Sequence, residues 1–380
     1  MQTFSFNTTA EIRFSDGALA EAQFDNLGAK VLLITDKGLR NLGITASVEK
    51  TLDGRVVIFD AVEADPSLET LMNAVEFGRA EGVTGVIGLG GGSSMDVAKL
   101  AALLLGSGEN LDEAWGVGNA KGPRLPLVLV PTTAGTGSEV TPVAIITIGA
   151  EEKRGVSSAI ILPDVAILDP ELTVGLPPAI TAATGIDAMV HAIEAYTSRN
   201  ANNNPMSKML AVQALDLLGA NIERAVTHGD DLEARGAMLM GSMLAGMAFA
   251  NSPVAAVHAL AYPIGGIFHV PHGLSNALIL AQVMRFNAPE CGAEYAELAP
   301  HVFPDIDTEQ GVQAVCAEFI ERLSDLSAKV GLPPRLRDVG IPEEACERMA
   351  KDAMVQSRLL VNNPREVSEA DALNIYRAAW

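Results

Sequence analysis

The sequence predicts an α/β protein in two parts, with a doubly wound parallel sheet over residues 1–179 and an all-helical domain over residues 180–380. Three observations lead to this prediction. The chain has 380 residues, which is more than one hydrophobic core comfortably accommodates. From Lys30 to Asp169, short apolar runs alternate with longer segments of helical period. Beyond this region the strand-like runs stop, so we expect the domain boundary near residue 179.

The predicted strands are short runs rich in valine, isoleucine and leucine. Strands that are apolar along almost their whole length indicate a sheet covered by helices on both faces. Sheets of this kind bind ligands at the carboxyl ends of their strands, where glycine-rich turns are expected. The predicted strands span residues 31–35, 56–60, 85–90, 126–132 and 165–169.

The C-terminal half is rich in alanine, leucine and methionine at helical spacing, for example over residues 205–225 and 232–250. Near the end of the chain, Ser368 precedes Asp371 by three residues, which is typical of a capping box. We therefore expect a last helix that runs towards Trp380.

Composition narrows the class of protein. The formal charge of −21 disfavours nucleic acid as a partner. No apolar run approaches the ~20 residues that a membrane span needs, and the first residues do not resemble a secretory signal, so we expect a soluble, cytoplasmic protein with no membrane partner. Three widely spaced cysteines indicate buried free thiols rather than disulfides. Chemistry on a small molecule fits these properties best.

A glycine-rich turn follows the predicted strand at 85–90. Gly90, Gly91 and Gly92 lead into a helix that opens with Ser93 and Ser94. Without side chains the backbone can approach a pyrophosphate, whose charge is met by free N–H groups and the positive end of the helix dipole. This pattern indicates a dinucleotide site, although three glycines also suit a tight turn with no ligand.

Two neighbouring features favour the dinucleotide. Asp36 follows the strand 31–35, where its carboxylate could bind ribose hydroxyls and repel a 2′-phosphate, which favours NAD over NADP. Its alternative role is a helix N-cap. After the strand 126–132, a loop carries the hydroxyls of Thr132 and Thr133 beside glycines, and the alternative there is a simple polar loop.

Asp187 and His191 are spaced i and i+4 in a helical segment, so both side chains lie on one face and can bind one ion. His258 and His272 are expected to reach the same point. We expect the helix of His258 to end before Pro263, with a glycine loop returning the chain to His272. One carboxylate and three imidazoles suit Fe(II), Zn(II) or Mn(II).

Taken together, these motifs make the chain resemble the iron-containing alcohol dehydrogenase family, related to glycerol dehydrogenases and dehydroquinate synthases. The resemblance covers nearly the whole chain. It implies a Rossmann-like N-terminal domain, an all-helical C-terminal domain as in dehydroquinate synthase, a cleft that holds NAD(P) and a metal, and a homodimer or larger homo-oligomer. The motifs that carry it are residues 90–99, 131–142, 162–173, 182–196, 258–276 and 362–371.

The resemblance also implies roles for individual residues. The metal ligands fall on Asp187, His191, His258 and His272. The cofactor contacts fall on Asp36, Gly91, Gly92, Ser93, Thr132, Thr133, Thr141, Lys153 and Leu176. Lys153 stands in a charged segment, where a solvated side chain is the alternative. Where some relatives carry a histidine four residues after the third ligand, this chain has Tyr262, so Tyr262 and His269 are the candidates for proton relay.

The implied reaction transfers a hydride between a small primary alcohol, or its aldehyde, and NAD, with the metal as Lewis acid on the alcohol oxygen. Alternatives on the same scaffold are a glycerol or propanediol dehydrogenase, a lactaldehyde reductase and a maleylacetate reductase. The last ranks low because residues 182–196 and 251–276 contain no arginine or lysine to bind carboxylates. From another class, an inactive metal- and nucleotide-binding protein is disfavoured because all four ligand positions are filled.

Overall fold

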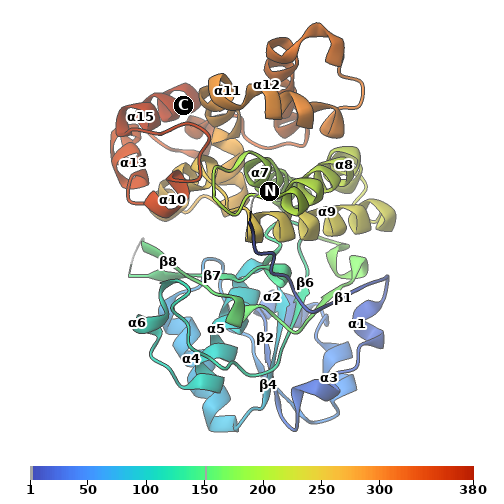
Figure 1. Cartoon of the computed structure of the whole chain (residues 1–380). Coiled ribbons are helices and arrows are strands. Elements are labelled where there is room, and N and C mark those ends of the chain that lie inside the picture. The colour runs from blue at the N-terminus through green and yellow to red at the C-terminus, as the bar shows by residue number, and fades with distance from the viewer. Residues whose placement is uncertain (1–2, 150–151) are drawn as a thin grey trace. The chain divides into compact units, whose positions relative to one another are not determined.

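The computed structural model describes residues 3–149 and 152–380 and divides the chain into two compact units (Figure 1). The α/β unit is Asn7–Val174. The helical unit comprises Gly175–Trp380 together with the start of the chain up to Phe6. The division after Val174 falls a few residues before the boundary that we expected at 179.

The α/β unit is built on a six-stranded sheet in which every described pairing is parallel. All five predicted strands are present, with ends that differ by a residue or two. The sequence analysis missed the first strand, EIRF, because it is short and none of its four residues is buried at the sheet edge. In spatial order the strands are β1 (Glu11–Phe14), β9 (Val165–Leu168), β6 (Leu127–Pro131), β4 (Gly85–Gly90), β2 (Val31–Ile34) and β3 (Val56–Phe59).

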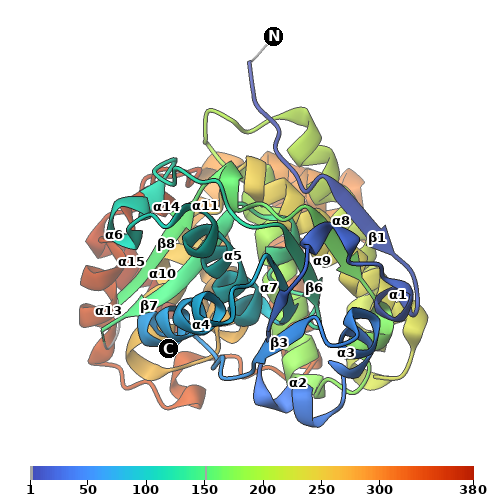
Figure 2. The same ribbon diagram turned by 90° about the horizontal axis from the view of Figure 1, so that it is seen from below.

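Helices cover both faces of this sheet, as the apolar strands predict (Figure 2). Because side chains alternate along a strand, Val31 and Leu33 pack against α1 (Ala18–Glu21) and α3 (Ala46–Leu52). Leu32 and Ile34 point to the opposite face, against α4 (Leu68–Glu81) and α5 (Gly92–Ser107). Two short helices complete the unit, α2 (Lys37–Asn41) and α6 (Leu111–Ala114).

A second, smaller sheet, which the sequence analysis did not predict, follows the loop after β6. Its strand β7 (Val143–Ile148) pairs antiparallel with β8 (Glu152–Ser157). A two-residue strand, β5 (Gly116–Val117), pairs with β8 on its other side. The buried and half-buried side chains that alternate along β7 carry the strand signal that the threonines and glycines obscured.

The helical unit contains the two long helices expected over 205–225 and 232–250. The last helix is also confirmed, because Ser368 and Asp371 form the capping box at its start. The helices are α7 (Pro178–Thr197), α8 (Pro205–Thr227), α9 (Leu232–Asn251), α10 (Ala256–Phe268), α11 (His272–Val302), α12 (Val312–Lys329), α13 (Ala345–Ala353), α14 (Ser357–Leu360) and α15 (Glu369–Ala379).

The expectation that a helix ends before Pro263 is wrong, because α10 continues through Pro263 and both following glycines to Phe268. Proline removes one backbone donor and strains the preceding turn. The hydroxyl of Tyr376 donates to the Leu260 carbonyl at 2.6 Å, which gives a carbonyl in that turn a partner. The helix ends instead at His269, whose left-handed backbone (φ 55°) forms the C-cap.

Two further expectations concern the chain as a whole. Cys291, Cys316 and Cys346 are buried free thiols, as predicted. Among the described residues, no single helix is long and apolar enough to cross a membrane, and α9 and α10 satisfy the test of length and composition only as a pair bent by 107°.

Candidate active site

Six predicted cofactor residues follow the ends of three neighbouring strands at one edge of the sheet: Asp36 after β2, Gly91, Gly92 and Ser93 after β4, and Thr132 and Thr133 after β6. Gly90 has a φ of 151°, and Gly91 is the N-cap of α5 without a side-chain hydrogen bond. A Cβ on Gly91 would lie 3.6 Å from the Thr133 hydroxyl, and one on Gly92 would lie 2.9 Å from a methyl of Thr136. The glycine turn and the threonine loop are therefore in contact. Together they present free helix N–H groups beside hydroxyls, which suits a phosphate.

Two residues that the sequence analysis missed hold this loop on α5. Lys99 is fully buried, and its ammonium donates to Ser138 Oγ (2.7 Å), Thr141 Oγ1 (3.2 Å) and the Val143 carbonyl (2.7 Å). Asp96 accepts a hydrogen bond from Ser138 Oγ at 2.7 Å. The signal in the sequence was an aspartate and a lysine three residues apart, shortly after the glycine turn.

Burial shifts the charges under this loop. Burial lowers the pKa of Lys99 to about 8, although Asp96 and Glu139 oppose the shift. It also raises the pKa of Glu139 to about 7, against the opposing effects of its own backbone N–H and of Lys99. One carboxylate oxygen of Glu139, Oε1, is buried without a hydrogen-bond partner. Ionised Glu139 is thus costly to the folded α/β unit.

Asp36 and Lys153 already have partners within the protein. Asp36 accepts a hydrogen bond from the Leu39 N–H at 3.0 Å and caps α2, so its alternative role is realised. Capping engages Oδ1 and is compatible with a ligand on the other carboxylate oxygen. Lys153, on β8, forms an ion pair with Asp65. Leu176 lies in the helical unit rather than in the α/β unit.

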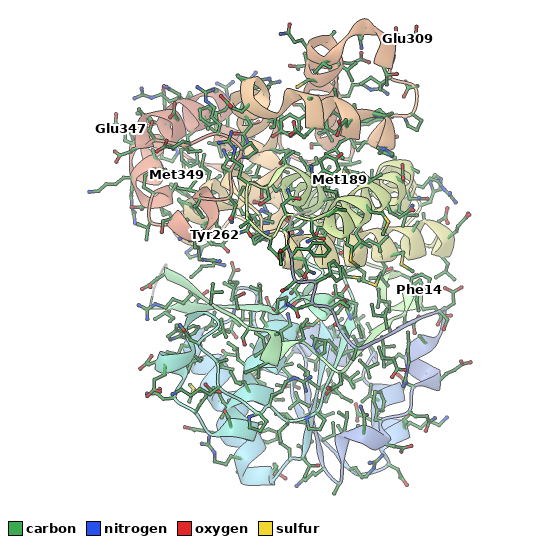
Figure 3. The ribbon with its side chains drawn as sticks, in the orientation of Figure 1. Phe14, Met189, Tyr262, Glu309, Glu347 and Met349 are labelled. Carbon is green, nitrogen blue, oxygen red and sulfur yellow. The ribbon has the colours of Figure 1, made fainter. Side chains whose placement is uncertain are left out.

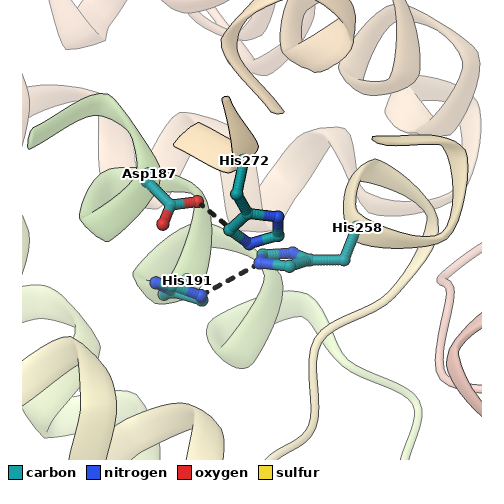
Figure 4. A group of neighbouring side chains, drawn as sticks. All are labelled: Asp187, His191, His258 and His272. Carbon is teal, nitrogen blue, oxygen red and sulfur yellow. Dashed lines mark hydrogen bonds and ion pairs between the residues drawn. The ribbon is translucent and has the colours of Figure 1, made fainter. Parts of the chain in front are cut away.

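The four predicted metal ligands converge in the helical unit, where one donor atom of each lies within 4.8 Å of the others (Figure 4). Asp187 and His191 share one face of α7, His258 comes from α10, and His272 opens α11. The Nε2 atoms of His191 and His258 are 2.9 Å apart, and Asp187 Oδ1 is 3.8 Å from His272 Nε2.

Gly273 permits this convergence. A Cβ at this position would lie 2.5 Å from the Ala183 carbonyl oxygen and 3.2 Å from the Cβ of Asp187. Only glycine lets the first turn of α11 approach α7 this closely. The close approach places His272 beside Asp187.

Glu194 is a further residue of this site that the sequence analysis missed. Its carboxylate accepts hydrogen bonds from His258 Nδ1 (2.7 Å) and from the N–H groups of Ala255 (3.0 Å) and Val257 (2.7 Å). A proton held on Nδ1 leaves Nε2 of His258 with a free lone pair directed at the other donors. The signal in the sequence was a glutamate one turn beyond His191 on the same helix.

The donor set fits a divalent cation. Asn276, one turn after His272, donates from its amide to Asp187 Oδ1 at 2.6 Å, while its own Oδ1 is buried without a hydrogen-bond partner. Burial alone would raise the pKa of Asp187, but the nearby histidines and the amide outweigh burial and hold the pKa below its ordinary value. An ionised carboxylate among imidazoles and an orphaned amide oxygen is the environment that a cation stabilises.

The cluster is accessible on one side. The His272 side chain is 36% exposed, whereas that of Asp187 is 2% exposed, so a small ligand can approach from the His272 side. Phe249 stacks on His191 at 4.4 Å, and the ring of Tyr262 lies 6.3 Å from that of His272. Exposed His269 is the C-cap of α10, and the structure does not bring it into the cluster of donor atoms.

A positively charged side chain from a distant segment also lies near the His272 side of the cluster. Arg358, on α14, donates from Nη2 to the Tyr262 hydroxyl at 3.3 Å, and its guanidinium lies 5.9 Å from the centre of the Tyr262 ring. The sequence analysis found no arginine or lysine in the segments around the ligands. Contact between α10 and α14 supplies one from outside those segments.

A doubly wound sheet with a glycine turn before a helix, together with a buried aspartate and histidine cluster, is typical of metal-dependent, nucleotide-linked enzymes. Comparison with known families is more specific. Residues 9–170 match the iron-containing alcohol dehydrogenase family, and residues 181–380 match the C-terminal domain of the same family. The chain therefore belongs to the iron-containing alcohol dehydrogenase family, and it is an alcohol and aldehyde oxidoreductase.

Individual relatives agree with this assignment. The chain is 44% identical to long-chain-alcohol dehydrogenase 1 of Geobacillus thermodenitrificans, over 93% of this chain and 90% of the relative. A solved structure of 1,3-propanediol oxidoreductase is 34% identical, with a TM-score of 0.95 and full coverage of both chains. Sulfoacetaldehyde reductase from Bifidobacterium kashiwanohense, solved in complex with NAD+, is 29% identical with a TM-score of 0.87 and covers 100% of this chain and 99% of its own.

The Glu139→Gln substitution should remove a pH-dependent cost. Because the folded protein raises the pKa of Glu139 from 4.5 to about 7, the folded state binds the proton more tightly, and stability falls as the pH rises through this interval. The melting temperature of the variant minus that of the wild type should therefore increase between pH 4.5 and pH 7. Exposed Glu69→Gln is the control, and a difference that stays constant with pH would contradict the prediction.

The Glu194→Gln substitution should weaken metal binding. Glutamine supplies one acceptor where His258 and two backbone N–H groups need a carboxylate, so the imidazole loses its fixed tautomer. We expect the dissociation constant for Co(II), followed by its visible absorption, to rise about 10- to 100-fold. Glu290→Gln, an exposed change in the same unit, should leave it unaltered. Equal affinity in both variants would rule out this role for Glu194.

Proposed function

We propose that the protein interconverts small primary alcohols and their aldehydes, with NAD as the hydride acceptor or donor. The observation that carries the proposal is the convergence of Asp187, His191, His258 and His272 at a buried point that is open beside His272. A catalytic metal needs such an open position for its substrate. In the oxidative direction, a hydride with two electrons leaves the alcohol carbon for NAD+, and the hydroxyl proton leaves separately.

These four residues would hold the cation, and Fe(II) is the first candidate, with Zn(II) and Mn(II) as alternatives. A divalent cation supplies Lewis acidity, which lowers the pKa of an alcohol hydroxyl and stabilises the charge that develops on its oxygen. Glu194 keeps the His258 proton on Nδ1, and Asn276 orients the Asp187 carboxylate. Phe249 beside His191 offers an apolar wall to the carbon chain of the alcohol.

The cofactor site that we propose is the glycine turn with the threonine loop. Gly91, Gly92, Ser93, Thr132, Thr133 and Thr141 would bind the pyrophosphate and nicotinamide parts, and Asp36 would bind the ribose hydroxyls. Lys153 and Leu176 are further proposed contacts. The acidic side chain at Asp36 favours NAD over NADP because it repels a 2′-phosphate.

Tyr262 is the better of the two proposed proton relays. Its ring lies 6.3 Å from that of His272, whereas His269 is an exposed helix cap. Arg358 donates to the Tyr262 oxygen, so the phenolic proton is free to point elsewhere.

A diol is the second substrate class, because 1,3-propanediol oxidoreductase is among the similar structures. The sulfoacetaldehyde reductase that also resembles this chain adds anionic aldehydes to the classes that an assay should include. A homodimer or larger homo-oligomer and a cytoplasmic location stay predictions.

The test is NADH formation, followed by absorbance, when the anaerobic protein reconstituted with Fe(II) meets NAD+ and a panel of small alcohols. We expect turnover that is lost on chelation, restored by Fe(II) and weaker with NADP+. Absence of turnover with every alcohol and aldehyde would favour the inactive metal- and nucleotide-binding alternative.

The Tyr262→Phe substitution should lower kcat by roughly 10²-fold or more, because general acid–base groups contribute at least that much. Metal content should stay the same, since the phenolic hydroxyl is not among the ligands. His269→Gln is the matched control and should change kcat by less than about twofold. The reverse pattern would assign the relay to His269.

A further inference from the structure

The amide group of Asn276 lies against the candidate metal centre. Asn276 follows His272 by one turn on α11 and is fully buried. Its nitrogen, Nδ2, lies 2.6 Å from Asp187 Oδ1, 3.3 Å from His258 Nε2 and 3.4 Å from His272 Nε2. One amide nitrogen is therefore within hydrogen-bond distance of three of the four predicted ligands that Figure 4 draws.

The oxygen of the same amide has no such partners. Among the described residues, Oδ1 of Asn276 is a buried atom without a hydrogen bond. The surroundings leave little access to solvent, since Met189, labelled in Figure 3, is fully buried on α7 between Asp187 and His191. A buried acceptor without a donor is unfavourable, so the amide is only half satisfied in this orientation.

The favoured orientation of the amide depends on what the ligands bind. Without a cation, the lone pairs of Asp187 Oδ1 and His258 Nε2 need hydrogen-bond donors, and Nδ2 supplies them. With a cation, these lone pairs bind the metal, and the partly positive N–H groups of the amide would face a like charge. A half-turn about the Cβ–Cγ bond exchanges the nitrogen and the oxygen, because this torsion is roughly twofold.

We propose that the amide oxygen of Asn276 is a fifth protein donor to the cation, in addition to the four ligands already described. The inference rests on the proposed metal centre and deepens it. Carbonyl and carboxylate oxygens suit Mn(II), whereas four donors complete the tetrahedron that Zn(II) prefers. Asn276 therefore biases the centre towards a metal that accepts more than four ligands, such as Mn(II) or Fe(II).

The first test measures metal affinity on the metal-free protein, by anaerobic titration with Mn(II) or Zn(II) against a competing chelator. In Asn276→Leu we expect the dissociation constant for Mn(II) to rise about 10- to 100-fold. The constant for Zn(II) should change by less than about threefold, because its four ligands remain. The smaller Asn276→Ala repeats the comparison if leucine prevents folding.

Asn276→Asp separates the oxygen from the nitrogen. Aspartate keeps an oxygen donor but has no N–H group to orient Asp187. If the oxygen binds the cation, this variant should bind Mn(II) at least about tenfold more tightly than Asn276→Leu. Its metal-free form should melt at a lower temperature than wild type, because the new carboxylate repels that of Asp187.

Asn287→Leu is the matched control. Asn287 is an equally inaccessible asparagine of α11, and its amide bonds to Asn363 rather than to the metal ligands. Its substitution should lower the melting temperature and leave both metal affinities unaltered. Equal losses of Mn(II) binding in Asn276→Leu and Asn276→Asp, or an unchanged ratio of Mn(II) to Zn(II) affinity in Asn276→Leu, would overturn the inference.

The visible spectrum of the Co(II)-loaded protein gives a second readout. Co(II) absorbs more weakly with five ligands than in a tetrahedral site, so Asn276→Leu should absorb more strongly than wild type. None of these measurements uses NAD or an alcohol. If the metal behaves as expected and no alcohol is oxidised, the proposed function fails and the inference stands. Normal turnover with identical Co(II) spectra in both proteins would reverse that outcome.

Discussion

The helical unit depends on one steric constraint, the close approach of α11 to α7. Gly273 meets the Ala183 carbonyl and the Asp187 side chain at distances that no larger residue allows. This contact sets where His272 lies relative to the aspartate and histidine of α7. Glu194, from the same α7, then fixes the start of α10 and the tautomer of His258. The helices α7, α10 and α11 thereby direct four metal-binding side chains to one point, and none of the four residues lies in a loop.

In the α/β unit, a buried charged side chain holds a loop in place. Its loop of threonines and glycines has only one short 3-10 helix, Ser138–Val140, and a buried ammonium under the loop supplies further hydrogen bonds. Lys99 binds this loop at three places, and its charge is balanced by Asp96 and Glu139. Burying charges in this way is unfavourable unless they are paired. The cost shows as a lowered pKa for the lysine and a raised one for Glu139.

Much of the fold and of the candidate metal site could be predicted from the sequence because the signals for them were local. Apolar runs located the strands, and i, i+4 spacing paired Asp187 with His191. Prediction failed where tertiary contacts override local rules. Pro263 does not end its helix, since the surrounding packing and the Tyr376 hydroxyl support the strained turn. Arg358 could not be connected with Tyr262 because they lie in separate segments, and only the packing of α14 on α10 joins them.

The unbroken α10 has a mechanical consequence. His258 and Tyr262 lie one turn apart on this helix, so the distance between them is fixed. Had the helix ended before Pro263, residues 263–271 would form a loop, and His272 could shift independently of His258. With the helix intact, only residues 269–271 separate α10 from α11, so His258 and His272 lie on two helices that follow each other directly. Helical geometry, rather than the conformation of a long loop, thereby sets the spacing of these two metal ligands.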